Sequence, residues 1–113
     1  MSGEDRIKMS VYLVAQIQIH ERERYAEYSS GFMDTFSQHK GEVLSVDESP
    51  GILEGEWPFT RTVLLTFPSR EDAEAWYFSE EYQALAQHRF AASDGNIIMI
   101  SGLENDRLNT AGR

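Results

Sequence analysis

The stretch Glu54–Arg89 constrains the fold of this chain more than any other part of the sequence. It contains an apolar, β-branched run, Thr62–Phe67, and Pro68 after it cannot continue the hydrogen bonding of a strand. Ser69 then has the character of a helix N-cap, with the acidic Asp72 at the third helical position. The stretch therefore predicts a strand that passes directly into a helix.

This helix is expected to break in its middle. Ser79 is followed by two glutamates, which is a second N-cap signature that opens another helical turn. We therefore expect a kink or break near Phe78, with Tyr82 and Arg89 on the helix that follows.

Two segments divide their side chains between two faces in the same way. In residues 11–19 the side chains on one face are all apolar, whereas those on the other are half polar, because side chains alternate along extended backbone. Residues 61–67 repeat this division. Both segments are expected in one sheet whose apolar face is covered by helices and whose half-polar face needs a partial cover.

Residues 21–40 change to helical periodicity. The aromatic residues of this segment are three or four positions apart and form one stripe: Tyr25, Tyr28, Phe32 and Phe36. Gly41 follows two basic residues, so we expect it to end the helix in the left-handed conformation.

The remaining segments complete the element order. Residues 42–47 form a short strand, residues 52–59 an irregular arm, residues 94–96 a turn and residues 97–101 a last strand. The order β-α-β-β-α-β defines a split β-α-β arrangement, with both helices on one face of an antiparallel sheet. The bare face would expose too much apolar surface for a monomer, so the sequence predicts a homodimer in which two open sheet faces meet.

Four separated segments carry a family resemblance: YLVAQIQI, LEGEW, TRTVLLTFPSREDAEAWYFSEEYQAL and IIMISG. Together they resemble domain-of-unknown-function family 1330 (DUF1330), a member of the dimeric α+β barrel superfamily. The resemblance covers roughly Tyr12–Gly102 and implies an α+β, ferredoxin-like protomer that dimerises. The family has no settled activity. Its wider superfamily includes cofactor-independent monooxygenases, isomerases and haem enzymes, so the fold alone implies no single function.

Composition narrows the classes of partner. The chain has 113 residues, which suits one domain, and its formal charge of −9 repels the phosphate backbone of nucleic acids. It has no cysteine, and no apolar run near the N-terminus has the length of a signal peptide or membrane span. We expect a cytoplasmic protein without a membrane partner. A single domain is expected over residues 10–103, with a flexible arm at 1–9 and a flexible tail at 104–113.

The three histidines do not have the spacing of a metal site, and no metal or cofactor is expected. His20 lies where the first strand meets the first helix, so it is a candidate acid or base. The alternative is an exposed or structural histidine. Motifs for phosphate binding, serine hydrolysis and zinc proteolysis are missing from the sequence.

The arm contains the first candidate ligand site. Glu54 is separated from a second glutamate by glycine, and Trp57 is extended because it precedes proline. Arg61 could fold back toward Glu54, so the arm could cap a cavity. The alternative is that the arm reaches across the two-fold axis and only strengthens the dimer.

The broken helix contains the second candidate group. Trp76 and Tyr77 could pack around a flat ligand, or Trp76 could be core and Tyr77 could close the dimer rim. Tyr82 and Arg89 share one helical face, where an arginine could bind a carboxylate or form a structural ion pair.

Three functions remain open at this level. The first is a module that binds a small, partly apolar anion near the dimer interface, where the arm meets the broken helix. The second is a cofactor-independent enzyme of monooxygenase or isomerase type, and the third is a structural dimer without a ligand.

Overall fold

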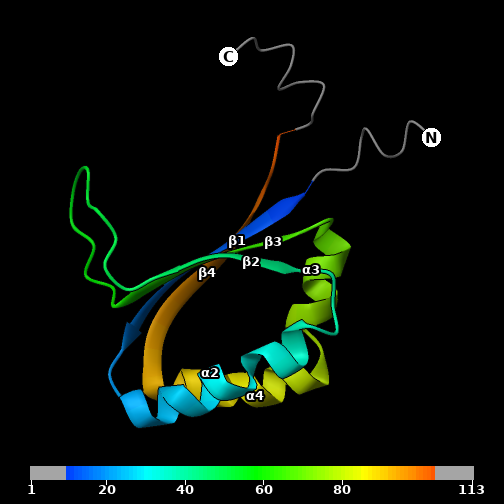
Figure 1. Ribbon diagram of the computed structural model, residues 1–113, viewed down its shortest axis with the longest axis horizontal. Helices are drawn as coiled ribbons and strands as arrows, with labels where there is room; N and C mark the ends of the chain where they lie inside the picture. Colours follow the sequence, from blue (N-terminus) through cyan, green and yellow to red (C-terminus); the bar gives the residue numbers. More distant parts are fainter. Residues whose placement is uncertain (1–9, 104–113) are drawn as a thin grey trace.

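The computed structural model describes residues 10–103, which form an antiparallel sheet with helices packed on one of its faces (Figure 1). The elements are β1 (Val11–Ile19), α2 (Arg22–Phe36), β2 (Glu42–Asp47), β3 (Arg61–Phe67), α3 (Arg70–Tyr77), α4 (Glu80–Ala92) and β4 (Ser93–Ser101). The strands lie in the order β2-β3-β1-β4, so the first and third strands are central. The predicted α+β, ferredoxin-like fold is confirmed.

Strand register separates the two faces as the sequence predicts. Ala15 lies opposite Val63 on the face that the helices cover. The preceding residue, Val14, lies opposite Leu64 on β3 and Ile98 on β4, and all three point to the other face. We call this second surface the open face. Ile98 is 56% exposed, which shows how little of the chain covers it.

Aromatic side chains dominate the core between helices and sheet. Of the predicted stripe on α2, Tyr25, Tyr28 and Phe36 are buried, and Phe32 packs against them partly buried. The stripe is confirmed. α2 packs against α4, and its aromatic rings belong to the core cluster that also contains the strand residues of the covered face.

The predicted break in the second helix is also confirmed. α3 ends at Tyr77 and α4 begins at Glu80. Each helix has its own serine cap: Ser69 Oγ accepts a hydrogen bond from the Asp72 backbone N–H, and Ser79 Oγ accepts one from the Tyr82 N–H, both at 3.1 Å.

The expected end of the first helix is wrong. α2 ends at Phe36, four residues earlier than predicted, and Gly41 does not have a positive φ. Glycine is needed at this position for a different reason. A Cβ atom there would lie 2.6 Å from ring atoms of both Phe36 and Phe67, so Gly41 lets the chain pass close to the aromatic core.

The expected turn at residues 94–96 is also wrong. β4 begins at Ser93, immediately after α4, and Gly95 pairs directly with Ile17. A Cβ at Gly95 would come within 3.1 Å of the Gln16 carbonyl oxygen, so this glycine serves close strand approach. The Asp-Gly-Asn sequence imitates a turn, but pairing with β1 determines the structure.

The segment between β2 and β3 is irregular, as predicted, and rises from the sheet on the side away from the helices (Figure 1). Its base is held by Thr60, whose backbone N–H donates to the Ile17 carbonyl at 2.9 Å. Its tip exposes two aliphatic side chains, Ile52 at 54% and Leu53 at 98%. We call residues 48–60 the arm.

None of the helices within residues 10–103 is long and apolar enough to cross a membrane. The flexible ends expected at residues 1–9 and 104–113 lie outside the described part of the chain.

Candidate functional site

A cavity of about 600 Å³ lies between α2 and the covered face of the sheet. This volume is within the range of small-molecule sites. α2 contributes its aromatic stripe, the strands contribute apolar side chains, and the broken helix contributes three residues: Trp76, Tyr82 and Arg89. The cavity reaches the exposed strand β2, where Val43 and Val46 line it and are themselves partly exposed.

One part of the cavity wall is entirely aromatic. Trp76 packs against Phe36, with ring centroids 5.3 Å apart. Phe67, which does not line the cavity, stacks on Trp76 at 5.7 Å. Phe32 closes the group from α2, 5.8 Å from Trp76. These flat faces favour an apolar or aromatic ligand body.

Polar groups line the cavity beyond Tyr82, whose ring lies 4.2 Å from that of Trp76. The Tyr82 and Tyr28 hydroxyls are hydrogen bonded at 2.7 Å. The guanidinium of Arg89 lies 5.6 Å from the Tyr28 ring. Of the residues that the broken helix contributes, the aromatic Trp76 therefore lies on one side of Tyr82 and the cationic Arg89 on the other. Ser37, His39 and Glu42 also line the cavity, next to Phe36 and Gly41.

Arg89 is the most unusual residue of the site. Its side chain is on a helix that packs against α2, and the residue is only 4% exposed. Within residues 10–103 no carboxylate forms an ion pair with it, and its Nε and Nη2 atoms are buried without a hydrogen-bond partner. A buried, unpaired charge is costly. In the described part of the chain the guanidinium instead contacts two aromatic rings, those of Phe90 at 4.9 Å and Tyr28 at 5.6 Å.

Trp76 Nε1 is also buried without a hydrogen-bond partner. In the described part of the chain, the buried side-chain atoms that lack a partner are this nitrogen and the two of Arg89, and all three are donors. Both residues line the same cavity. An acceptor group placed beside Arg89 would satisfy two of these three donors.

The neighbouring tyrosines do not supply the missing negative charge. Burial raises the pKa of the Tyr28 hydroxyl well above its usual range, and the Tyr82 hydroxyl beside it adds to the effect. Burial also raises the pKa of Tyr25, although Arg61 and Arg89 act in the opposite direction. Both phenols are neutral at physiological pH, so neither gives Arg89 a negative partner. Burial lowers the pKa of Arg89, but the Tyr82 and Tyr28 hydroxyls outweigh this effect, and the pKa is raised overall.

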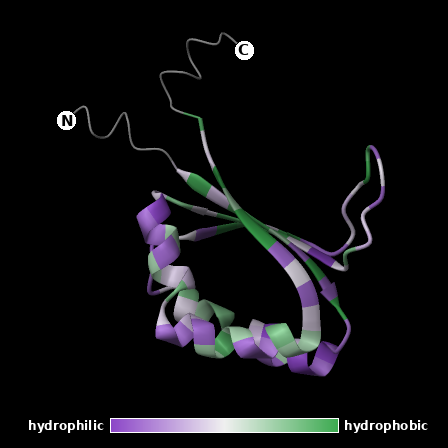
Figure 2. Cartoon of the chain, turned by 180° about the vertical axis from the view of Figure 1, so that it is seen from behind, coloured by the Kyte–Doolittle hydropathy of each residue, from purple (hydrophilic) through white to green (hydrophobic). Residues whose placement is uncertain are grey.

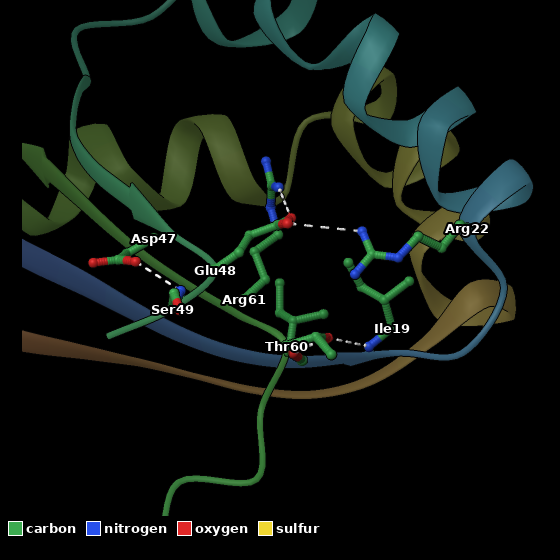
Figure 3. Close-up of polar contacts among 8 residues, drawn as sticks. Ile19, Arg22, Asp47, Glu48, Ser49, Thr60 and Arg61 are labelled. Carbon is green, nitrogen blue, oxygen red and sulfur yellow. Dashed lines mark hydrogen bonds and ion pairs between the residues drawn. The ribbon is translucent and has the colours of Figure 1, made fainter. Parts of the chain in front are cut away.

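Arg61 also lines the cavity, but it has a partner. Its Nη1 lies 2.7 Å from Glu48 Oε2, and the other oxygen of Glu48 lies 3.8 Å from Arg22 on α2 (Figure 3). The expectation that Arg61 folds back toward Glu54 is therefore wrong. The arm carries Glu54 away from β3, whereas Glu48 directly follows β2, the neighbour of β3 in the sheet.

The other candidate residues lie outside the cavity lining. His20 is exposed and lies 3.8 Å from Asp94, and Glu54 is exposed on the arm. Tyr77 is half-buried and packs edge-on against Trp76. Trp57 donates from Nε1 to Thr62 Oγ1 at 2.8 Å, and Thr62 belongs to the open face. The structure therefore brings together Arg61, Trp76, Tyr82 and Arg89, but not His20, Glu54, Trp57 or Tyr77.

Sequence reasoning missed Glu48, Tyr25 and Tyr28 as site residues. The two tyrosines were expected only as core, although a hydroxyl within a buried stripe needs a polar partner, and this was a usable signal. Glu48 gave no comparable signal, because its pairing with Arg61 depends on the path of the chain between β2 and β3.

The open face is the second surface of interest. On this face Tyr12 of β1 lies opposite Ile100 of β4, and Val14 of β1 lies opposite Ile98 of β4. Figure 2 shows hydrophobic residues along these strands, and no described helix lies on this side. Trp57 of the arm is hydrogen bonded to Thr62, near the start of the central strand β3.

Residues 10–103 match the family described as domain of unknown function (DUF1330), and the chain belongs to this family. A comparison with curated proteins finds no match.

Three solved structures illustrate the fold. A protein of unknown function from Rhodopseudomonas palustris, RPA0582, is 17% identical with a TM-score of 0.73, over 86% of this chain and 85% of that one. A dimeric ferredoxin-like protein of unknown function from Thermobifida fusca is 8% identical with a TM-score of 0.63, over 85% and 93%. SnoaB, a cofactor-independent oxygenase from Streptomyces nogalater, is 14% identical with a TM-score of 0.58, over 86% and 96%. At these identities the similarity establishes the fold alone.

Proposed function

We propose that this member of the DUF1330 family binds a small, partly apolar organic anion in the cavity between α2 and the sheet, with Arg89 as its anchor. One observation carries the proposal: the buried Arg89 has two free donor atoms and no acidic partner within residues 10–103. A ligand carboxylate would supply both the missing charge and the missing acceptors.

The polarity of the cavity supports one orientation of the ligand. The anionic group lies at Arg89 and the Tyr28–Tyr82 hydroxyl pair, and the apolar body lies toward Trp76 and Phe36. The two hydroxyls need only one proton for their mutual bond, so the second O–H is available to the ligand. A flat aromatic monocarboxylate has this combination of groups.

The proposal includes a homodimer formed through the open face. An open sheet face with Val14, Leu64 and Ile98 in one row needs a cover, and a second copy offers an identical apolar surface. The Thermobifida fusca structure is that of a dimeric ferredoxin-like protein, which supports this assembly. The arm rises on the same side, so in the proposed dimer it contacts the partner copy.

The ligand site can be tested with 2-naphthoate and its neutral analogue 2-naphthamide in isothermal titration calorimetry. Wild type should bind the carboxylate, and Arg89→Met should weaken this binding about 10- to 100-fold, since hydrogen bonds to charged groups contribute roughly 1.5–3 kcal/mol. Binding of the amide should change much less. Arg70→Met is the matched control, because Arg70 is exposed at the start of α3.

Stability without ligand separates an anchor from a structural arginine. If Arg89 awaits a ligand, Arg89→Met removes an uncompensated buried charge, and the free energy of unfolding should stay unchanged or rise. Loss of about 2 kcal/mol or more, with naphthoate affinity unaffected, would contradict the proposal and assign Arg89 a structural role.

A second candidate function is a cofactor-independent enzyme that uses the same cavity. The Tyr28–Tyr82 hydroxyl pair favours it, because it places an exchangeable proton beside the anion site, and SnoaB supports it as a cofactor-independent oxygenase of similar fold. Mass spectrometry of aromatic acids incubated with the protein in air tests this candidate. Products that disappear in the Tyr82→Phe variant would favour the enzyme, whereas unchanged acids would favour a binding module.

A further inference from the structure

The two arginines of the cavity differ in how they are paired. Arg61 is bound to Glu48 at 2.7 Å, whereas Arg89 has no acidic partner in the described chain. The Arg61 guanidinium also lies 5.5 Å from the Tyr25 ring, and both arginines act on the Tyr25 hydroxyl. The two arginines therefore flank the same tyrosine, but only Arg61 is neutralised by a carboxylate of the described chain.

Glu48 lies where the main cavity adjoins a smaller hollow. That hollow shares Tyr25, Ser29 and Arg61 with the main cavity, and Glu48 and Arg22 are among the other residues that line it. Figure 3 shows the Glu48 carboxylate between the two guanidiniums, so it is held from both sides. The carboxylate thus occupies Arg61 at this end of the cavity.

Occupation of Arg61 has a consequence for ligands with two negative charges. A second ligand carboxylate could reach Arg61 only by replacing Glu48, and exchanging one carboxylate for another yields little net free energy. Glu42 also lines the cavity and forms no ion pair with either arginine within residues 10–103, so it disfavours a second negative charge. The overall charge of −9 acts in the same direction.

We propose that Glu48 is a specificity-determining residue that restricts this cavity to singly charged anions. It neutralises Arg61 with a carboxylate of the chain itself and leaves Arg89 as the one arginine that a ligand can neutralise. The inference rests on the proposed ligand site and adds the charge of the ligand to it.

The test compares two probes with the same ring system, 2-naphthoate and 2,3-naphthalenedicarboxylate, whose two carboxylates lie at the same end of the rings, by calorimetry at pH 7.5. Wild type should prefer the monoanion by about 10-fold or more, on the scale of one charged hydrogen bond. Glu48→Gln should raise the affinity for the dianion by a similar factor and change the affinity for the monoanion by less than about 2-fold. Glu74→Gln is the control, because it removes one negative charge from an exposed position of α3.

The outcomes separate this inference from the proposed function. The role of Glu48 would be overturned if Glu48→Gln raised the affinity for both probes equally, or if Glu48→Gln and Glu74→Gln had equal effects. The Arg89-dependent binding of naphthoate would still stand. Wild type that binds the dianion as tightly as the monoanion would overturn it too. If neither probe binds to wild type or to Glu48→Gln, the ligand site itself is contradicted, and this inference with it.

Discussion

The two faces of the sheet come from the same strands but differ in what completes them. On the covered face, Phe67 is 1% exposed and the helices bury it with α2's aromatic stripe. On the open face, Ile98 and Ile100 are 56% and 46% exposed, although they alternate with residues that face the helices. One face is covered by the helices of the chain itself, and the other is left largely exposed by residues 10–103.

The comparison also shows where a ligand can be recognised. The covered face contains the cavity and its partnerless donors at Arg89 and Trp76, which are unsatisfied in spite of a well-packed surrounding. The open face is apolar and amide-rich, with Gln16 opposite Asn96, and offers no buried charge. We therefore propose ligand recognition on the covered face and assembly on the open face.

The largest expected effect is on the covered face. Trp76→Ala should lower the free energy of unfolding by roughly 3–5 kcal/mol, because the side chain is 2% exposed and packs against several rings. Urea denaturation measures it. Leu53→Ala, at the exposed tip of the arm, is the control, and equal shifts in both variants would refute the packing described here.

A charge on the open face should act on assembly instead. Leu64→Glu places a carboxylate in the centre of the proposed dimer interface, and an unpaired buried charge costs about 3 kcal/mol or more. The dimer dissociation constant should rise about 100-fold or more. Light scattering should then give a mass near that of one 12.9 kDa chain. Wild type that is already monomeric at micromolar concentration would contradict the role given to this face.

Gly41 provides a smaller effect on the covered face. Gly41→Ala forces a methyl group against Phe36 and Phe67 and should destabilise the protein by roughly 1–3 kcal/mol. Gly51→Ala, where a Cβ meets open space, is the matched control. If the denaturation midpoint shifts no more for Gly41→Ala than for Gly51→Ala, the two rings move aside to accommodate the methyl group.

The smallest effect depends on pH. Because the folded state raises the pKa of Tyr28, the unfolded chain loses this proton near pH 10 while the folded chain keeps it. The stabilisation is complete below pH 10, and above it the free energy of unfolding should fall by up to about 1.4 kcal/mol per pH unit.

Urea titrations at pH 8 and pH 11 compare wild type with Tyr28→Phe. The phenylalanine variant should lose less stability between the two pH values, since only Tyr25 then still has a raised tyrosine pKa that makes stability fall with pH. An identical loss in both proteins would show that Tyr28 is not protected from ionisation in the folded state.

The faces could be predicted from the sequence because they depend on local periodicity. The alternation of apolar side chains in residues 11–19 indicates which of them are buried, and so does the aromatic spacing in α2. Ser69 and Ser79 indicate where α3 and α4 begin. The role of Gly41 could not be predicted, because the rings that require it come from residues on two other elements.

The site was predictable only in part. Tyr82 and Arg89 share one face of α4, so their grouping follows from helical spacing, and Trp76 joins them across the break from α3. The Arg61–Glu48 pair depends on how the arm leaves the sheet. The role of the arm residues Glu54 and Trp57 stays a prediction, as does that of His20. The cytoplasmic location and the absence of a nucleic-acid partner also stay predictions from composition.

The central claim is that a ligand anion neutralises Arg89 on the covered face, and a crystal structure of the protein with 2-naphthoate tests it most directly. The account predicts a carboxylate at about 2.7–3.2 Å from Arg89 Nε and Nη2, with the rings toward Trp76 and Phe36. A naphthoate bound with its carboxylate away from Arg89, or a cavity that stays empty at saturating ligand, would contradict it.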